Sequence, residues 1–373
     1  MHMLPKSFVF PFSVALAVAA CLLLSCQPAR RQSELLWQQS FFLIGSQSSP
    51  RASDLNQDGV LDLVMGAGTE EIAHTEQGVL ALDGKSGNLL WQQPTSAHIT
   101  GSATFYDLTG DGVEEVFIGG RVQNLKAING KTGELIWEYA YQYEDDPVLK
   151  YARFNFYNSV LVPDQNQDGL PDLLTVNGGN WLAPAGDSLH RYPGLLMLFD
   201  LKTGAILAAD TMPDGRESYM SPVCFPPDSA GGVRILVGTG GETAGGRLYL
   251  TTLADLMASR LEAARVLAAS ATHGFIAPPV LADFNGDGHL DIAAVSHDMQ
   301  IFALDGQRLQ LLWKQQLPGA ECSNSFALGH FNDDGLPDLF TLASRGSWPK
   351  NTTSYQLMLD GATGQWLYLD SLG

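Results

Sequence analysis

Short apolar segments alternate with polar turns along most of the chain, a pattern typical of antiparallel strands. A nine-residue polar stretch precedes several of them, and "DLNQDGVLD" at 54–62 leads into the apolar "LVMGAG". Related stretches begin at 107, 164, 283 and 330, and a degenerate one begins at 228. Successive starts lie 53, 57, 64, 55 and 47 residues apart. The chain is therefore predicted to repeat one unit of short strands.

Each unit ends in a second recurring pattern, which is two apolar segments joined by a turn rich in Asp, Asn and Gly. The segments "VLALDGKSGNLLWQQ" at 79–93 and "LKAINGKTGELIWEY" at 125–139 show it clearly, and the second apolar segment often carries Trp. Similar segments occupy 195–209, 301–315 and 355–369. This spacing predicts a β-hairpin. Four strands at such a period are typical of a β-propeller blade.

The predicted fold is all-β, a single β-propeller of four-stranded blades. Six units are visible, so six blades are expected. Seven is the alternative, because "ELLWQQ" at 34–39 looks like the fourth strand of another blade. That segment would either pair with the last blade or add an outer strand to it. A solenoid competes less well, since its repeats are usually shorter. In "LADLMASRLEAARVLAAS" at 253–270, Ala, Leu and the i, i+4 spacing favour helix over strand.

The N-terminus has the features of an export signal. Lys6 precedes a mostly apolar run over residues 8–24, which predicts a signal peptide at 1–25. The following Leu-Leu-Ser-Cys order resembles the lipobox of bacterial lipoproteins, and this implies lipidation of Cys26. Residues 26–34 would then be the lipidated cysteine and a tether, and residues 35–373 the propeller domain.

These features predict a protein of the cell envelope of a Gram-negative-type bacterium. Membrane contact is expected only through the lipid anchor, because no other stretch of about 18 apolar residues occurs. Gln27 after the cysteine favours the outer membrane, without indicating its periplasmic or its surface side. Cys224 and Cys322 also remain in the mature chain, where two free thiols are favoured over a disulfide.

The net charge of the chain limits the classes of partner that it is expected to bind. The 373 residues include 21 Lys and Arg against 40 Asp and Glu, which gives a formal net charge of −19. Such a field repels nucleic acid and anionic membrane surfaces, so no nucleic-acid partner is expected. About a third of the acidic residues occupy ligand positions of the nine-residue stretches.

Those stretches place oxygen-bearing side chains at positions 1, 3, 5 and 9, with glycine at position 6 permitting a sharp turn. With the main-chain carbonyl of position 7, such donors suit a hard cation. Three to five calcium sites are expected. The candidate ligands are Asp54, Asn56, Asp58, Val60, Asp62, Asp107, Thr109, Asp111, Val113, Glu115, Asp164, Asn166, Asp168, Leu170, Asp172, Asp283, Asn285, Asp287, His289, Asp291, Asn332, Asp334, Leu336 and Asp338.

Two departures and one alternative accompany this assignment. Thr109 and Glu115 replace Asn and Asp in the second loop, and His330 replaces the first Asp of the last loop. The alternative is that the loops are turns stabilised by Asp and Asn side chains and bind no metal. The first loop is not an EF-hand, since Met65 stands where the twelfth-position Glu would be.

Two family resemblances rest on these motifs. The D-x-N-x-D-G-x-x-D loop and its following strand resemble the FG-GAP repeat of integrin alpha-chain propellers, a resemblance that implies calcium in the loops. The Asp-Gly-x-Thr/Ser-Gly-x-x-x-Trp hairpin resembles the repeat of pyrroloquinoline-quinone-type propellers. Together they cover residues 35–373. Calcium in turns closed by protein ligands would be structural.

Function is then expected at the other end of the blades, where the connections are long and varied. Segments 139–164, 177–194, 213–222 and 344–354 combine aromatic residues with Arg and Asn, which suits stacking on sugars or gripping a protein. The alternative is loop packing against the blades. The candidate ligand-binding face comprises Tyr151, Arg153, Asn155, Tyr157, Trp181, Arg216, Glu217, Tyr219, Arg345 and Trp348.

Three functions compete. The favoured one is a non-enzymatic, lipid-anchored, calcium-stabilised binding or scaffold protein for an envelope protein or glycan. The first alternative is a calcium-dependent polysaccharide lyase or hydrolase, and the second is a quinoprotein-like dehydrogenase. No catalytic residue is assigned, because the sequence offers no evident acid pair outside the loops and no G-x-S-x-G motif. His98 and His273, each just before an inner strand, are interpreted as structural.

Overall fold

The computed structural model describes residues 35–180, 182–184, 187, 190–346 and 350–372. The chain divides into two units, Met1–Gln38 and Gln39–Gly373. The predicted signal peptide, Cys26 and the tether lie outside the described residues. Among the residues that are described, no helix has the length and apolar character needed to cross a membrane.

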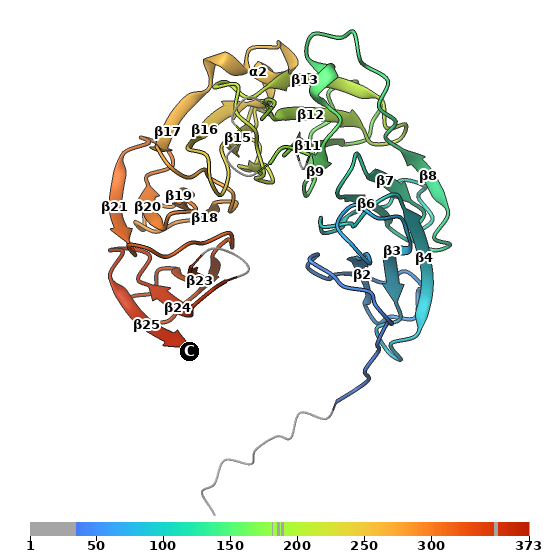
Figure 1. Cartoon of the computed structure of the whole chain (residues 1–373), viewed down its shortest axis with the longest axis horizontal. Coiled ribbons are helices and arrows are strands. Elements are labelled where there is room, and N and C mark those ends of the chain that lie inside the picture. The colour runs from blue at the N-terminus through green and yellow to red at the C-terminus, as the bar shows by residue number, and fades with distance from the viewer. Residues whose placement is uncertain (1–34, 181, 185–186, 188–189, 347–349, 373) are drawn as a thin grey trace, which may run out of the picture. The chain divides into compact units, whose positions relative to one another are not determined.

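Six antiparallel sheets follow one another along residues 39–373, and we number them blades 1 to 6 (Figure 1). Within each blade, four strands pair in chain order. Blade 1 contains β1 (Arg51–Ser53), β2 (Asp62–Gly66), β3 (Thr75–Leu82) and β4 (Leu89–Thr95). Blade 2 contains β5 (Thr104–Tyr106), β6 (Glu115–Gly119), β7 (Leu125–Ile128) and β8 (Leu135–Glu138). Blade 3 contains β10 (Val160–Val162), β11 (Asp172–Gly178), β12 (Leu195–Asp200) and β13 (Ile206–Thr211), with β9 (Asn155–Phe156) also paired to β11.

The second half of the domain repeats this order. Blade 4 contains β14 (Val223–Cys224), β15 (Arg234–Gly238), β16 (Gly246–Thr252) and β17 (Arg265–Ser270). Blade 5 contains β18 (Val280–Ala282), β19 (Asp291–Val295), β20 (Gln300–Leu304) and β21 (Leu311–Gln316). Blade 6 contains β22 (Ala327–Gly329), β23 (Asp338–Arg345), β24 (Thr353–Leu359) and β25 (Trp366–Leu372). The prediction of an all-β propeller with six blades is confirmed.

Two local predictions need correction. Residues 35–39 of the expected extra strand form no strand, and the first pairing of the described chain is a single bridge between Gly45 and Gly68. The helix predicted within 253–270 is real but short, and α2 spans Leu253–Met257. Thr252 begins it by accepting the N–H of Asp255 at 3.1 Å.

The remainder of that segment is a 3₁₀ turn, η2 (Leu261–Ala263), and then β17, which pairs with β16. Pairing with a neighbouring strand therefore outweighs the helical preference of its alanines. A second 3₁₀ turn, η1 (Leu149–Tyr151), lies between blades 2 and 3.

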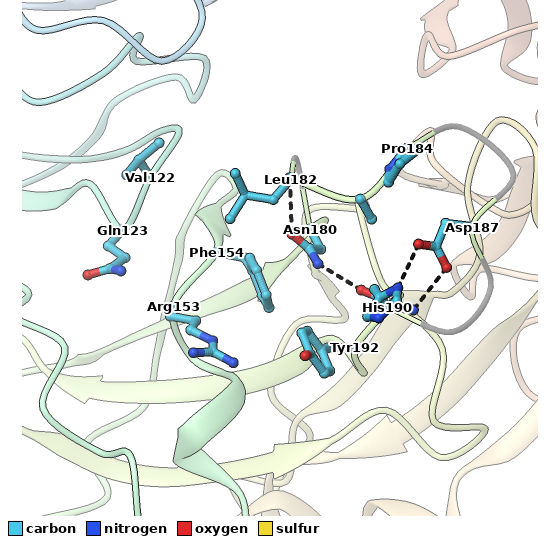
Figure 2. A pocket seen from close by; sticks show the side chains of 11 residues that line it. Val122, Gln123, Arg153, Phe154, Asn180, Leu182, Pro184, Asp187, His190 and Tyr192 are labelled. Atoms are coloured by element: carbon cyan, nitrogen blue, oxygen red, sulfur yellow. Dashed lines mark hydrogen bonds and ion pairs between the residues drawn. The ribbon is translucent and has the colours of Figure 1, made fainter.

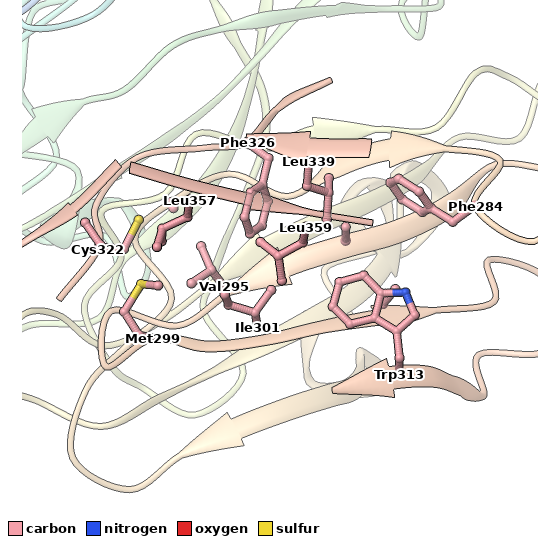
Figure 3. Packing of buried hydrophobic residues seen from close by; sticks show 14 of the residues in the cluster. Phe284, Val295, Met299, Ile301, Trp313, Cys322, Phe326, Leu339, Leu357 and Leu359 are labelled. Carbon is pink, nitrogen blue, oxygen red and sulfur yellow. The ribbon is translucent and has the colours of Figure 1, made fainter. Parts of the chain in front are cut away.

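Inner strands are buried on both faces. In blade 5, Val295 packs with Leu357 of blade 6 (Figure 3), whereas Ile292 packs with Leu248 of blade 4. Successive strand residues point to opposite faces, so a strand with a neighbour on each side needs a continuous apolar run such as "DIAAV" at 291–295. In the part of the chain that is described, a buried apolar cluster joins each of blades 1 to 5 to the blade that follows it along the chain.

The recurring tryptophans lock consecutive blades together. The Trp313 indole N–H donates to the Gly361 carbonyl in the next hairpin turn at 2.7 Å, and the ring lies against Gly364. Gly364 has φ +72° and a Cβ there would meet the Trp313 ring at 2.5 Å, so both backbone and space require glycine. Trp91 and Trp137 make the same contacts with blades 2 and 3. This explains the fixed spacing of Gly and Trp in the hairpin motif.

The two mature-chain cysteines are free, as predicted. Cys224 is half-buried in β14, and Cys322 is buried in the cluster between blades 5 and 6 (Figure 3).

Candidate functional site

Each blade has two chemically different ends. The turn between its first two strands and the hairpin turn between its last two lie at one end, which we call the loop end. The turn between the second and third strands and the connections between blades lie at the other, which we call the cavity end. All the predicted calcium ligands are at the loop end, and the candidate ligand-binding residues belong to connections at the cavity end.

The first acidic loop is closed by its own side chains. Asp54 accepts the backbone N–H groups of Asp58 at 3.1 Å and Gly59 at 3.0 Å. Asn56 accepts the N–H of Asp58 at 2.9 Å, and Asp58 accepts that of Val60 at 2.9 Å. These bonds fix the loop so that the side chains at positions 1, 3 and 5 turn toward its own backbone. The loops at 164 and 283 repeat this arrangement.

The carboxylate at position 9 ties the loop to the hairpin turn of its own blade. Asp62 is fully buried and accepts the N–H groups of Leu55 at 2.9 Å and Gly84 at 2.9 Å. Asn56 also donates to Asp83, the acidic residue of the hairpin turn, at 3.1 Å. The two sequence motifs are therefore halves of one structural unit.

Sequence reasoning missed this second set of acids. The hairpin acids Asp200, Asp305 and Asp360 occupy the position of Asp83 in their own blades, and Asn129 occupies it in blade 2. In blade 6, Asp334, Asp338 and Asp360 each place an oxygen within 4.8 Å of the others. The Asp-Gly repetition in the hairpins was the available signal, but it was assigned only to turn formation.

Burial, and after it the nearby carboxylates, raises the pKa of the position-9 acid in three loops. Burial, followed by the charges of Asp164, Asp200 and Asp168, raises the pKa of Asp172 to about 6. Burial raises the pKa of Glu115 and of Asp291 as well, and neighbouring loop carboxylates add to both shifts. In the 107, 164 and 283 loops the position-9 acid is therefore partly buried beside other carboxylates, and both conditions disfavour its charged form.

Three loops depart from the pattern. His330 stands at position 1 in place of the usual carboxylate ligand. Its Nδ1 lies 2.9 Å from the position-7 carbonyl oxygen of Leu336, so it also contacts the main-chain oxygen that would be a second ligand. Thr109 donates to Glu115 at 3.4 Å, so the 107 loop keeps its closure with altered residues. The 228 loop is only a turn around Asp228, which accepts the N–H groups of Ala230 and Gly232.

The donor set fits calcium at the 54, 107, 164 and 283 loops. Their candidate side-chain ligands carry oxygen donors at positions 1, 3, 5 and 9, and each Asp54 oxygen keeps a second lone pair beyond its hydrogen bond. Oxygen-only sites with several carboxylates suit calcium over softer metals. The 330 loop fits less well because of His330.

The cavity end contains a cavity of about 630 Å³ between the connections of blades 2 and 3 (Figure 2). Its volume is in the range of small-ligand sites. The described residues that line it are Val122, Gln123, Arg153, Phe154, Asn180, Leu182, Ala183, Pro184, Asp187, His190 and Tyr192.

Two stacked rings and a guanidinium form one wall of the cavity. Phe154 and Tyr192 stack with ring centroids 5.7 Å apart and an interplanar angle of 19°. The Arg153 guanidinium carbon lies 5.5 Å from the Tyr192 centroid and 5.9 Å from that of Phe154. Tyr151 does not line the cavity, but its ring centroid lies 5.7 Å from that of Tyr192. The wall thus offers flat apolar surface beside a positive charge.

A second part of the cavity lining carries polar side chains. His190 Nδ1 lies 2.7 Å from Asp187 Oδ2, and Asn180 donates to the His190 carbonyl at 2.7 Å. The Asn180 side chain also accepts the Leu182 N–H at 3.1 Å (Figure 2). These bonds connect the two ends of one loop, so the polar wall is held by internal contacts.

A buried ion pair lies beside this loop. The Arg191 guanidinium donates to Glu217 at 3.1 and 3.2 Å and to the Tyr219 hydroxyl at 2.9 Å. Tyr219 packs edge-on against Tyr157, 6.2 Å between centroids. Burial, then the Glu217 charge, raises the pKa of Tyr219. This group links blades 3 and 4. It also fixes the backbone between His190 and Tyr192, the two cavity-lining residues on either side of Arg191.

Among the members of the predicted face that the structure describes, Arg153 alone lines the cavity, and Tyr151 touches its wall. Asn155 is buried and structural, accepting the Val122 N–H and donating to the Gly179 carbonyl. Arg216 pairs with Asp214 and donates to Gly245, and Arg345 donates to Pro318 beside Tyr355. Each of these three side chains bonds to the backbone of a neighbouring connection, and none of them lines the cavity, so their assignment to a ligand face stays a prediction. Trp181 and Trp348 lie outside the described residues.

Val122, Gln123, Asn180 and Asp187 were not singled out from the sequence. Val122 and Gln123 carry no distinctive chemistry, and only a positive φ marks them, 50° and 64°. They reach the cavity because the turn of blade 2 lies beside the connection to blade 3, where the Gln123 N–H donates to the Phe154 carbonyl at 2.9 Å. No sequence signal carries that proximity.

Family models match both motifs. The model described as an FG-GAP-like repeat matches residues 283–341, which hold the loops of blades 5 and 6. The model described as outer membrane protein assembly factor BamB matches residues 31–210, which include blades 1 to 3. No curated protein sequence matches the chain. The chain is thus a β-propeller that combines FG-GAP-like and PQQ-type repeats, as the two resemblances implied.

Solved structures share the fold at low identity. BamB from Moraxella catarrhalis is 12% identical with a TM-score of 0.50, over 87% of this chain and 76% of its own. The quinohemoprotein alcohol dehydrogenase ADHIIG from Pseudomonas putida HK5 is 11% identical with a TM-score of 0.52, over 91% of this chain and 62% of its own. BBS1N, in complex with ARL6DN, is 11% identical with a TM-score of 0.51, over 90% and 86%. These likenesses establish the propeller fold.

Proposed function

We propose that this chain is a calcium-stabilised binding protein of the bacterial cell envelope, anchored through lipid on Cys26, that holds a segment of a partner protein in the cavity between blades 2 and 3. The observation that carries the proposal is the cavity wall of Phe154, Tyr192 and Arg153. Stacked aromatic rings beside a guanidinium are the side chains that dominate protein-binding hot spots.

The cavity favours binding over hydrolysis. Of the described residues that line it, Asp187 alone is acidic, whereas most glycosidases need two carboxylates across the scissile bond. The likeness to BamB, an outer membrane protein assembly factor, and to BBS1N, solved with a partner protein, supports a protein ligand over a glycan. The expected envelope location and the lipid anchor are consistent with that class.

Calcium has a supporting role in this proposal. Asp54, Asn56, Asp58 and Asp62, with their counterparts in the 107, 164 and 283 loops, would hold the ion at the loop end. Calcium there neutralises the crowded carboxylates and binds the first two strands of a blade to its hairpin turn. Stiffer blades would in turn hold the connections at the cavity end in fixed positions, although the calcium lies at the other end.

The test is capture by matched variants of the full-length protein. Wild type, Tyr192→Ala and Tyr368→Ala are immobilised and exposed to solubilised envelope extract. Tyr368 is a suitable control, since its side chain is exposed in β25 and bonds only to Asp370 among the contacts described. Wild type and Tyr368→Ala are expected to retain a set of proteins that Tyr192→Ala loses.

Pretreating the extract identifies the ligand class. Protease digestion is expected to abolish the retained material, and periodate oxidation of glycans is expected to leave it. Retention that survives protease but not periodate contradicts a protein ligand. Identical capture by all three variants contradicts the cavity as the binding site.

A further inference from the structure

The Arg153 guanidinium is a cation without an acidic partner among the described residues of a strongly acidic chain. The 373 residues include 21 Lys and Arg against 40 Asp and Glu. Three other arginines pair with carboxylates at 3.0, 3.1 and 2.9 Å, namely Arg121, Arg191 and Arg308. By contrast, the Arg153 side chain forms no hydrogen bond or ion pair with any described residue, and its guanidinium lies beside the rings of Phe154 and Tyr192. Its charge is therefore available to a ligand.

The backbone fixes the place from which this side chain leaves. Arg153 follows η1, and its N–H donates to the Tyr151 carbonyl at 2.9 Å. The Phe154 N–H donates to the Asn177 side chain at 3.2 Å, and the Phe154 carbonyl accepts the Gln123 N–H at 2.9 Å. Phe154 itself is buried. Arg153 is thus an exposed side chain on a hydrogen-bonded backbone, and its cation–π contacts hold it at the cavity wall.

The acid of the described cavity lining does not neutralise this charge. Asp187 Oδ2 lies 2.7 Å from His190 Nδ1, and Asp187 Oδ1 accepts the His190 N–H at 3.1 Å. Figure 2 shows Tyr192 between Arg153 and Asp187, so the two charges belong to different parts of the lining. Gln123 also lines the cavity, and its side-chain amide bonds to no described residue. The wall beside Arg153 thus offers a positive charge, two flat rings and an amide.

We propose, resting on the proposed function, that the partner segment presents a carboxylate to Arg153. A guanidinium binds a carboxylate through two parallel hydrogen bonds, which add geometric selectivity to the attraction between the charges. A neutral segment in the cavity would remove water from Arg153 without replacing its hydrogen bonds, and this is unfavourable. A flat apolar side chain beside the carboxylate would cover Phe154 and Tyr192. The Gln123 amide can donate to and accept from the backbone of the segment.

The net charge of the chain limits how acidic that segment can be. At −19, the protein repels a run of acidic residues as a whole. A single carboxylate in contact with Arg153 gains its attraction at short range, where salt screens least. The expected segment therefore carries one isolated acidic group next to an apolar residue. That group is an Asp or Glu side chain or the C-terminal carboxylate, which supply the same chemistry.

Peptide selection by the immobilised full-length protein, in millimolar calcium, tests this proposal. Two arrays of random dodecapeptides are used, one with amidated and one with free C-termini. The proteins are wild type, Arg153→Glu, Tyr192→Ala and the control Arg265→Glu, since Arg265 is exposed in β17 and forms no ion pair among the described residues. Wild type and the control are expected to select a carboxylate beside an aromatic or branched apolar residue. Arg153→Glu is expected to lose these peptides and to select Lys or Arg instead.

The two arrays separate the two sources of the carboxylate. Selection on the amidated array assigns it to an Asp or Glu side chain, and selection confined to free C-termini assigns it to the chain end. Either result supports the proposal.

Fluorescence anisotropy with one selected peptide separates this proposal from the proposed function. Replacing the peptide's carboxylate by an amide is expected to weaken binding at least about tenfold to wild type and less than about twofold to Arg153→Ala. Equal weakening in both proteins overturns this proposal and leaves the binding function standing, as do peptides that require Tyr192 but show no excess of carboxylates. Failure of wild type to select any peptide beyond those of Tyr192→Ala contradicts the proposed function itself, and this proposal with it.

Discussion

The two ends of the blades follow opposite rules. At the loop end, blades 1, 2, 5 and 6 repeat one hydrogen-bond scheme, in which a buried carboxylate such as Asp62 joins the acidic loop to the hairpin turn. Blade 3 makes the same join through Asn166, which donates to Asp200. At the cavity end the described connections differ from blade to blade, with an aromatic cavity in blades 2 and 3 but paired histidines in blades 4 and 5. Repetition marks what the fold needs, and variation marks where binding chemistry is placed.

The largest expected effect is the loss of thermal stability when calcium is removed from the loop end. Calcium at one hundred times its Kd adds about 2.7 kcal/mol per site to the free energy of unfolding. For three sites, chelation should lower the melting temperature by on the order of 10 °C or more. Differential scanning calorimetry of metal-loaded protein with and without chelator measures this.

Asp287→Asn separates metal binding from turn formation. In the wild type, the Asp287 side chain accepts the His289 N–H at 2.9 Å. Asparagine at this position can still accept that bond, but it carries no charge. Part of the chelator effect should disappear in this variant and persist fully in Asp228→Asn, which lies in the degenerate loop. Equal chelator effects in wild type and Asp287→Asn would leave the loops as metal-free turns.

The second effect tests whether repeated contacts at the loop end join the blades. Trp313→Ala removes a ring that is 7% exposed together with its bond to the Gly361 carbonyl, and should lower the free energy of unfolding by about 3–5 kcal/mol. Tyr368→Ala removes the ring at the matching position of blade 6, which is 42% exposed, and should cost much less. Equilibrium denaturation in urea compares them. Equal costs would refute the role assigned to the tryptophan.

A third, smaller effect concerns the cavity. Arg153→Ala should weaken binding of the captured partner about tenfold, because it removes the charge and the flat group over Tyr192. Arg153→Lys should weaken it nearly as much, since an ammonium group does not stack as a guanidinium does. Biolayer interferometry with the isolated partner measures both. Full recovery by lysine would show that charge alone is needed.

The smallest effect is a pH dependence at the cavity end. Burial, followed by the Arg121 charge, lowers the pKa of His98 below its usual 6.5. The unfolded chain then binds a proton at higher pH than the folded one, so the stability that His98 contributes is complete above 6.5 and falls as pH decreases through the folded pKa. His98→Gln should flatten the melting temperature between pH 7 and 5 in calcium-saturated protein. His190→Gln, whose side chain is 64% exposed, serves as control.

Much of the loop end could be predicted from sequence, since its chemistry lies within nine residues. Asp54 and Asp62 are local to one loop, and their spacing fixes their roles. The contribution of Asp83 was missed because its partner Asn56 lies 27 residues away. The strand at 265–270 was missed because pairing with β16, and not local preference, determines it.

The residues that line the cavity were only partly predictable. The sequence singled out aromatic residues of the inter-blade connections, and the cavity lies among those connections, but Asn155 and Arg216 bond to neighbouring groups and do not line it. The cavity joins a turn of blade 2 to a loop of blade 3, and Gln123 takes part only because the two blades are adjacent. Which connections meet depends on the packing of blades, which single-sequence patterns do not encode.

The most direct test of the account places a photo-crosslinking amino acid at either end of the full-length protein and exposes it to envelope extract. Position 123 lines the cavity, whereas Lys85, in the hairpin turn of blade 1, is exposed at the loop end with a side chain 69% accessible. The account predicts a discrete crosslinked protein partner from position 123 that is absent from position 85 and is lost with Tyr192→Ala. The same partner crosslinked from position 85, or from position 123 despite Tyr192→Ala, would contradict it.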